Sequence, residues 1–234
     1  MKSIKLLFSV AVLGLSLMSC KKNNAQPQEP TDFHQTATTK FIDVNGTKCA
    51  YRELGDKPGI PVLMVASLGS AMDDWDPAIT NGLAKSNRVI LFDIPGVGSS
   101  GGNTPNTVAD MATSVTAFIK KLGIPKVNLI GFSLGSFITQ QIALTEPALI
   151  NKIILTGTGP KGAIGLSNLP TLLVEGANLS PEDNFLKFGF TNSDASIMAG
   201  KQSWTRIQQR VNDRDPAVSQ ASAGAEVQAV LAWA

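Results

Sequence analysis

The chain has 234 residues, of which 43% are hydrophobic and 16% charged, and its formal net charge at neutral pH is +2. This length predicts one domain with room for an inserted subdomain, and the apolar content suffices for a large core. The small net charge, with no basic run in the body of the chain, argues against a nucleic-acid partner. Two cysteines cannot build a disulfide scaffold, and Cys49, in a predicted strand, is expected to be a small buried side chain.

The first twenty residues have the pattern of an export signal. A short basic stretch, Met1–Lys5, precedes a mainly apolar stretch of 13 residues, 6–18, which is too short to span a bilayer comfortably. It ends in Leu17-Met18-Ser19-Cys20, which resembles the lipobox of bacterial lipoproteins. The resemblance implies cleavage before Cys20, lipidation of that cysteine and stable anchoring of an exported protein to the inner or the outer membrane. Ordinary signal cleavage and a retained N-terminal membrane helix are the alternatives.

Residues 21–40 are polar and rich in Asn, Gln, Pro and Thr. Such a composition offers too little apolar surface to form a core, so this stretch is expected to be a disordered tether. It contains His34, the one histidine of the sequence. A histidine in a tether is a poor candidate for a catalytic base.

From residue 41 the pattern alternates between strands and helices. Two β segments meet at Asn45-Gly46, a strong hairpin signal, and residues 60–66 form a continuous apolar run typical of a buried central strand. Asp76-Pro77 predicts the start of a helix, because it combines a capping side chain with a proline at the first helical position. Residues 88–93 predict the next buried strand.

An amphipathic helix is predicted over residues 107–122, because apolar side chains recur there at intervals of three and four. A short apolar strand then leads into Gly131-Phe132-Ser133-Leu134-Gly135 and a helix that runs to about Glu146. A further strand is predicted over residues 152–157. Strands that alternate with helices in this way indicate a mostly parallel, doubly wound α/β sheet, which we expect within residues 41–159.

The run Gly131-x-Ser133-x-Gly135 stands between a strand and a helix, the context in which it forms a nucleophile elbow. The turn forces the serine into a strained backbone conformation, so strand and helix can approach only if the flanking positions lack side-chain bulk. Gly131 and Gly135 meet that requirement. The first amides of the following helix would favour negative charge that develops beside Ser133.

From residue 160 the pattern becomes helical. Helices are predicted over residues 181–190, 194–211 and 216–233 with no strand between them, and residues 160–234 are expected to form a helical cap. An ordinary helical end to the domain is the alternative. Five aromatic side chains are expected to make the packed face of the cap: Phe185, Phe188, Phe190, Trp204 and Trp233.

From about Phe41 to Ala234 the chain resembles the α/β-hydrolase superfamily, and within it the bacterial α/β hydrolases and cofactor-free, non-haem haloperoxidase-like proteins. The resemblance rests on ordered blocks: Asp73-Asp74-Trp75-Asp76-Pro77, residues 92–100, the elbow, Thr156-Gly157-Thr158-Gly159-Pro160, and the Arg214-Asp215-Pro216 turn. It implies an α/β-hydrolase fold in which Ser133 attacks an ester-type carbonyl. It also implies that the backbone amides of Leu68 and Leu134 hold the resulting oxyanion.

Two features depart from the family pattern. The family usually has a histidine just before the first oxyanion donor, whereas this chain has Ala66-Ser67-Leu68-Gly69-Ser70, so the loop lacks the side chain that usually helps to fix it. The family also places an acid and then a histidine after the serine, and no histidine follows Ser133. The acids that follow it are expected to be surface or capping residues: Glu146, Glu175, Glu182, Asp183, Asp194, Asp213, Asp215 and Glu226.

Two explanations account for this absence. The favoured one is truncation, with the last strands, the acid and the histidine beyond residue 234; the other is a complete protein that kept the sheet and lost the chemistry. The predicted function is a membrane-anchored serine hydrolase that acts on a small or moderately apolar ester-like substrate without a cofactor or metal. The alternative is a non-catalytic, membrane-anchored binding protein. If the chain is complete, little hydrolase activity is expected, and the pattern indicates neither the substrate nor the oligomeric state.

Overall fold

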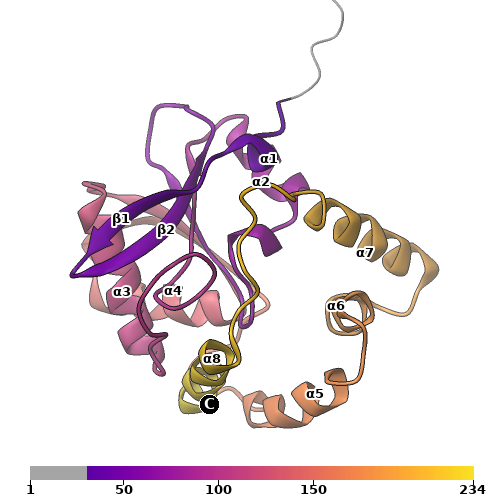
Figure 1. Cartoon of the computed structure of the whole chain (residues 1–234). Coiled ribbons are helices and arrows are strands. Elements are labelled where there is room, and N and C mark those ends of the chain that lie inside the picture. Colours follow the sequence, from indigo (N-terminus) through magenta and orange to yellow (C-terminus); the bar gives the residue numbers. More distant parts are fainter. Residues whose placement is uncertain (1–30) are drawn as a thin grey trace, which may run out of the picture. The chain divides into compact units, whose positions relative to one another are not determined.

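Within residues 31–234, six strands build one sheet in the order β1-β2-β4-β3-β5-β6. Figure 1 labels the first two, β1 and β2. The computed structural model describes residues 31–234. The strands are β1 (Lys40–Val44), β2 (Thr47–Leu54), β3 (Val62–Val65), β4 (Val89–Phe92), β5 (Val127–Phe132) and β6 (Ile150–Thr156). β2 pairs antiparallel with β1 and with β4, whereas β4, β3, β5 and β6 are parallel. The mostly parallel α/β sheet predicted from the sequence is confirmed.

Eight α-helices accompany the sheet within residues 31–234. They are α1 (Phe33–Thr36), α2 (Pro77–Ala84), α3 (Val108–Lys121), α4 (Leu134–Thr145), α5 (Leu169–Gly176), α6 (Pro181–Gly189), α7 (Asp194–Ile207) and α8 (Gln220–Trp233). Short 3-10 turns occur at Met72–Asp74, Pro147–Leu149 and Leu166–Asn168. No helix in this part of the chain combines the length and the apolarity needed to cross a membrane.

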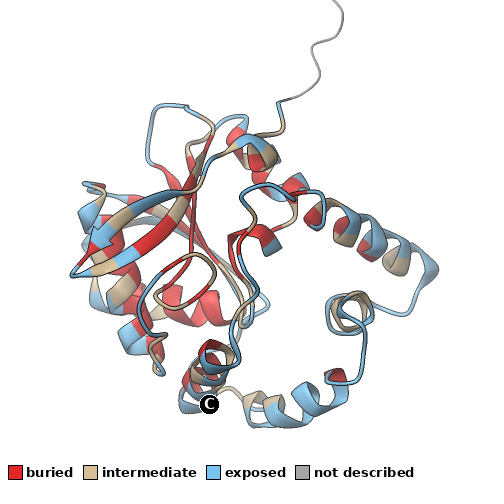
Figure 2. Cartoon of the chain, viewed as in Figure 1, coloured by how far each residue is buried: buried red, intermediate tan, exposed pale blue. Residues whose placement is uncertain are grey.

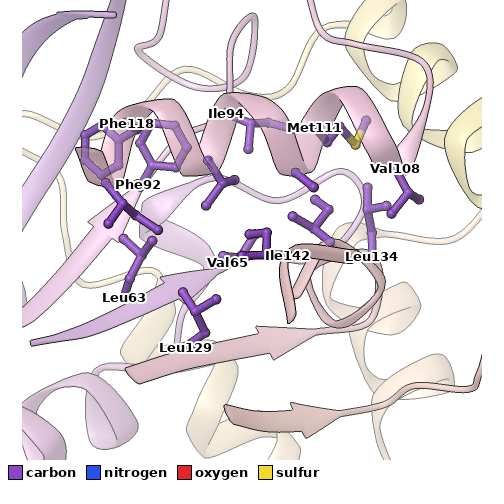
Figure 3. Close-up of a cluster of buried hydrophobic side chains, with 14 of the residues drawn as sticks. Leu63, Val65, Phe92, Ile94, Val108, Met111, Phe118, Leu129, Leu134 and Ile142 are labelled. Carbon is purple, nitrogen blue, oxygen red and sulfur yellow. The ribbon is translucent and has the colours of Figure 1, made fainter. Parts of the chain in front are cut away.

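The core has two parts because successive side chains of a strand point to opposite faces of the sheet. Leu63 and Val65 belong to the larger cluster, with side chains from α3, α4 and α8, and Figure 3 shows many of its members. Val62 and Met64 belong to the smaller cluster, with α2 and β2. The central strands β3 and β4 are therefore buried at every position, as their red colour shows (Figure 2), whereas the edge strand β6 is mostly exposed.

Local signals set the element boundaries where the sequence predicts them. Asp76 accepts a hydrogen bond from the Ala78 N–H at the start of α2, and Thr107 accepts one from the Asp110 N–H at the start of α3. Asn45 and Gly46 both have positive φ, 53° and 82°, which is the backbone geometry of a two-residue hairpin turn.

The predicted tether does not extend to residue 40. Residues 33–36 form α1, and His34 is only 1% exposed because the helix packs on α2. The His34 N–H donates to Asn81 Oδ1 at 2.8 Å, and its ring Nδ1 lies 2.9 Å from Thr80 Oγ1. The prediction of disorder is wrong for residues 33–36, because Thr80 and Asn81 of α2 supply hydrogen-bond partners for His34. Residues 21–30 of the predicted tether, and the export signal with Cys20, lie outside the described residues.

The helical region after β6 also differs from the prediction. α5 was not predicted, and α8 packs on α3 and α4 instead of joining a cap, with Ala229, Val230 and Trp233 inside the larger core cluster. The Trp233 ring stacks on Phe137 at a centroid separation of 5.7 Å. The expectation that Trp233 packs with the cap aromatics is therefore wrong. The small alanine side chains of α8 allow it to lie close to α4, and Ala229, Val230 and Trp233 are buried there.

Candidate active site

The elbow residue Ser133 stands between the last residue of β5 and the first residue of α4. Its φ of 51° and ψ of −115° are unusual for a residue with a side chain. The surrounding backbone holds it there, since the Ser133 N–H donates to Thr156 O at 2.9 Å and Ser133 O accepts from Ser136 N–H at 2.8 Å. Residues that their surroundings hold in a strained backbone conformation are common at functional sites.

The two elbow glycines are required because backbone atoms lie where a Cβ would be. A Cβ on Gly131 would lie 2.4 Å from Gly135 O, and a Cβ on Gly135 would lie 2.0 Å from Val65 O. Neither carbonyl belongs to a flexible side chain that could move aside. Ser136 stabilises the turn, since its hydroxyl donates to Gly131 O at 2.7 Å.

Ser133 and Leu68 line one pocket of about 320 Å³. The structure thus brings together the predicted nucleophile and one predicted oxyanion donor, which come from different strands. The other walls are mainly apolar and come from the loop after β6, α4, α5 and α8: Phe137, Gly157, Thr158, Gly159, Ala163, Ile164, Gly165, Leu166, Leu169, Leu172 and Val230. Leu134, the second predicted donor, is buried at the start of α4 directly after Ser133.

Glu226 fixes the loop that carries Leu68. The Gly69 N–H donates to Glu226 Oε2 at 2.8 Å, and the hydroxyls of Ser67 and Ser70 lie 2.8 Å apart. Gly69 itself has a φ of +73°, which a side chain would resist. These contacts give the loop a side-chain support from α8 in place of the histidine that the family pattern has.

Glu226 was expected to be a surface or capping residue, and that expectation is wrong. It is 1% exposed, and burial raises its pKa to about 7, against the effect of the Gly69 N–H. The sequence contains a signal for this burial, a single charged residue in an otherwise uncharged helix. Glu226 is the one charged residue between Gln220 and Trp233, among alanines and valines.

A buried ion cluster, defined as Arg52, Asp73, Arg210 and Asp215, lies near the same edge of the sheet. Arg52 Nη1 donates to Asp73 Oδ1 at 2.5 Å, and its Nη2 lies 3.3 Å from Asp215 Oδ2. The Asp215 N–H donates to Asp73 Oδ2 at 2.6 Å. Asp215 was expected at the surface, which is wrong, because its carboxylate is buried against Arg52 and accepts from Ser99 Oγ at 2.7 Å.

The carboxylates around this cluster titrate differently. Burial alone would raise the pKa of Asp73, but the hydrogen bonds from Arg52 and from the Asp215 N–H hold the pKa below its usual value. Burial and then repulsion from Asp215 raise the pKa of Asp93 well above its usual value. The Asp93 carboxyl accepts the Met72 N–H at 2.8 Å and the Ser99 N–H at 3.2 Å, so it joins the loops after β3 and β4.

A second cavity, of about 520 Å³, begins at Phe132, the residue before the nucleophile position. Its core side includes Trp75 and Phe132, and its cap side includes Phe185 and Trp204. Phe132 is 44% exposed, although it ends a central strand, because it faces this space. The cavity also touches Ser67, Gly69 and Ser70 of the oxyanion loop.

No histidine lines either cavity among residues 31–234. His34 lies against α2, and burial lowers its pKa to about 4. The described residues also contain no group of three or more His, Cys, Asp or Glu side chains placed to hold a metal ion. Within residues 31–234, the site therefore combines the predicted nucleophile Ser133 and the predicted donors Leu68 and Leu134 without a neighbouring imidazole.

Comparison with known proteins gives consistent results. The family model described as "alpha/beta hydrolase fold" matches residues 60–221. An α/β hydrolase fold protein from Chitinophaga pinensis is 41% identical, with a TM-score of 0.84 over 86% of this chain and 73% of that one. The enol-lactonase from Burkholderia xenovorans LB400, 21% identical, shares the fold with a TM-score of 0.58 over 82% of this chain and 73% of its own.

Among curated sequences, "Putative carbamate hydrolase RutD" from Serratia proteamaculans (strain 568) is 35% identical over 108 residues. The match covers 45% of this chain and 40% of that protein. The chain thus aligns with less than half the length of this relative.

Proposed function

Because the chain belongs to the α/β hydrolase family, we propose that it is a serine hydrolase that cleaves a small or apolar ester-like substrate through an acyl-enzyme on Ser133. The observation that carries the proposal is the conformation of Ser133. A side-chain residue held at φ 51° between two obligatory glycines, in one pocket with Leu68, has the arrangement that an exposed nucleophile needs.

In the proposed reaction Ser133 Oγ attacks the substrate carbonyl while a base removes the hydroxyl proton. The carbonyl oxygen becomes an oxyanion that accepts hydrogen bonds from the Leu68 and Leu134 amides. Collapse of this intermediate expels the alcohol, which takes the proton, and leaves an ester on Ser133. Attack by water then releases the acid and restores the hydroxyl. The largely apolar walls of the pocket favour a small or apolar acyl group.

The residues that line the Ser133 pocket, within residues 31–234, include no histidine that could act as the base. In a serine triad, loss of the histidine lowers the rate by a factor of about 10⁶. We therefore expect residues 1–234 by themselves to acylate slowly and to respond to an added base that can enter the pocket.

Fluorophosphonate labelling in the presence and absence of imidazole tests the proposal. We expect slow labelling of the 234-residue protein, acceleration by imidazole, and complete loss in Ser133→Ala. Ser114→Ala, which removes a hydroxyl from the surface of α3, serves as the matched control and should label normally. Fast labelling without imidazole would show that a base is already present. No Ser133-dependent labelling under either condition would overturn the hydrolase assignment.

The second candidate function is a non-catalytic binding protein. The observation in its favour is the absence of an imidazole beside Ser133 within residues 31–234, in a pocket that is otherwise formed. This candidate predicts that Ser133→Ala binds small esters as well as the parent protein does, and that neither protein labels with the probe.

We also propose, from the pattern of residues 1–20, that lipidated Cys20 anchors the exported protein to a bacterial membrane. The measurement is the mass of the mature N-terminus together with its partition into detergent after expression in a bacterium. An acylated Cys20 is expected, and Cys20→Ala should leave the protein unacylated. Cleavage at another position without acylation would overturn the proposal.

A further inference from the structure

The cavity beside Phe132 is walled by aromatic rings from both sides. On the core side, the Trp75 and Phe132 ring centroids are 6.3 Å apart; on the cap side, those of Phe185 and Trp204 are 5.5 Å apart. Aromatic faces carry negative potential, and they bind cations and apolar groups alike. A volume of about 520 Å³ is within the range typical of small-molecule sites.

Among residues 31–234, Asp74 is the one ionisable residue that lines this cavity. Its Oδ2 accepts the Ala71 N–H at 2.8 Å, which fixes the carboxylate on the cavity wall. Asp74 is exposed to solvent, although the surrounding protein removes part of the water from its carboxyl group. Burial raises the pKa of Asp74 above its usual value, and the Ala71 N–H and the charge of Arg214 do not compensate fully.

Comparison with the neighbouring acids shows what Asp74 lacks. Asp73 pairs with Arg52, and Asp76 Oδ2 lies 2.7 Å from Arg206 Nη2. Within residues 31–234, Asp74 has no basic side chain inside salt-bridge distance. The guanidinium of Arg214 is engaged elsewhere, since its Nη1 donates to the carbonyls of Ile207 and Arg210.

A carboxylate in a mainly apolar, aromatic cavity gains most from a ligand that brings the opposite charge. We propose that this cavity binds an ammonium group of the substrate, with Asp74 as its counter-ion and the four rings around its alkyl groups. The inference rests on the proposed function, because Phe132 directly precedes Ser133 and the cavity shares the oxyanion loop. It makes the substrate an ester-like molecule with a cationic group on one side of the scissile bond.

Binding of choline measures this preference without any chemistry at Ser133. Its uncharged isostere 3,3-dimethyl-1-butanol has the same shape, so the difference between the two reports the charge alone. Trp75 and Trp204 line the cavity, and their fluorescence provides the signal. We expect choline to bind at least about fivefold more tightly than the isostere, in the parent protein and equally in Ser133→Ala.

Two variants locate the preference. Asp74→Asn keeps an oxygen for the Ala71 N–H, and it should weaken choline binding about fivefold while leaving binding of the isostere unchanged. Asp194→Asn is the matched control, because it removes the same charge from the exposed first turn of α7 outside the cavity. Trp204→Leu removes one ring and should also weaken choline more than the isostere. Thermal unfolding of each variant establishes that it is folded.

Equal affinity for choline and its isostere, an unchanged preference in folded Asp74→Asn, or no binding of either compound would overturn the cation site. These outcomes do not depend on acylation. If the protein prefers choline but never labels at Ser133, the cation site stands and the hydrolase assignment is overturned. If it labels at Ser133 but shows no preference for choline, the hydrolase assignment stands and the cation site is overturned.

Discussion

The nucleophile elbow and the buried ion cluster both organise the carboxyl edge of the sheet, but different forces hold them. The elbow is five consecutive residues whose shape depends on backbone atoms in contact, and it contains no charge. The ion cluster joins Arg52 of β2, Asp73 after β3, and Arg210 and Asp215 after α7 through paired charges. An added side-chain atom at Gly131 or Gly135 should therefore destabilise the elbow, whereas the loss of one charged side chain should destabilise the ion cluster.

Removal of Arg52 should have the largest effect, because it leaves two buried carboxylates without their main partner. We expect Arg52→Met to lower the free energy of unfolding by about 3–5 kcal/mol, measured by urea denaturation. Arg88→Met is the control, since Arg88 pairs with Glu53 in a partly exposed position and its loss should cost less than about 1 kcal/mol. Equal effects of the two substitutions would mean that the cluster is no more than a surface ion pair.

Addition of one methyl group to the elbow should come next. Gly135→Ala places a Cβ against the Val65 carbonyl, and we expect a loss of about 3 kcal/mol or a failure to fold. Gly82→Ala is the control on α2, where no atom lies within 4 Å of the new Cβ, and it should be neutral or stabilise by up to about 1 kcal/mol. A stable Gly135→Ala protein would contradict the steric account of the elbow.

Glu226 holds the oxyanion loop through the Gly69 N–H, and its effect on stability should depend on pH. Its pKa is about 7 in the fold against an ordinary 4.5, so the folded protein retains a proton that the unfolded chain releases. This contribution to stability is fully present below pH 4.5 and is lost as the pH rises through 7, to a total of about 3 kcal/mol.

Glu226→Gln stays neutral at every pH and keeps an oxygen for the Gly69 N–H. It should be more stable than the parent at about pH 8 by up to about 3 kcal/mol, with no advantage near pH 4. Urea denaturation across this pH range measures the difference, and Glu182→Gln, at a half-buried position in the first turn of α6, is the control. Parallel stability curves for parent and Glu226→Gln would contradict the raised pKa.

The smallest predicted effect is relief of strain at the nucleophile position. Ser133→Gly should stabilise the protein by about 1 kcal/mol, because glycine adopts a positive φ without penalty. Ser133→Ala keeps the Cβ and should leave the stability nearly unchanged, although both variants lose fluorophosphonate labelling. Thermal unfolding compares them, and a destabilised Ser133→Gly would show that the conformation is not strained.

These differences also explain how much could be predicted from the sequence. The elbow, the hairpin at Asn45-Gly46 and the caps at Asp76 and Thr107 are local, so the residues that cause them are neighbours in the chain. The sheet followed from the same local patterns, and its fold class was correct.

The errors concern residues whose partners are distant in sequence. His34, Asp215 and Glu226 resemble surface residues by composition, and only the packing of α2, Arg52 and Gly69 against them accounts for their burial. The sequence predicts α8 as part of the cap because it belongs to a run of helices with no strand between them. A helix rich in alanine has no strongly polar face, so its pattern does not indicate what it packs against. The sequence shows that the oxyanion loop lacks a histidine, but the hydrogen bond from Gly69 to Glu226 of α8 could not be predicted without the fold.

Arg210 has a mechanical consequence. Its guanidinium donates to the carbonyls of His34 at 2.6 Å and Ala37 at 2.7 Å, and it also bonds to Asp213. A pull on the chain from the N-terminal side of Thr31 would therefore load Arg210 and the segment that leaves α7 before it reached the hairpin of β1 and β2. Arg210 Nε also lies 3.4 Å from Asp73 Oδ1, so the same side chain would pass part of this load to the loop after β3.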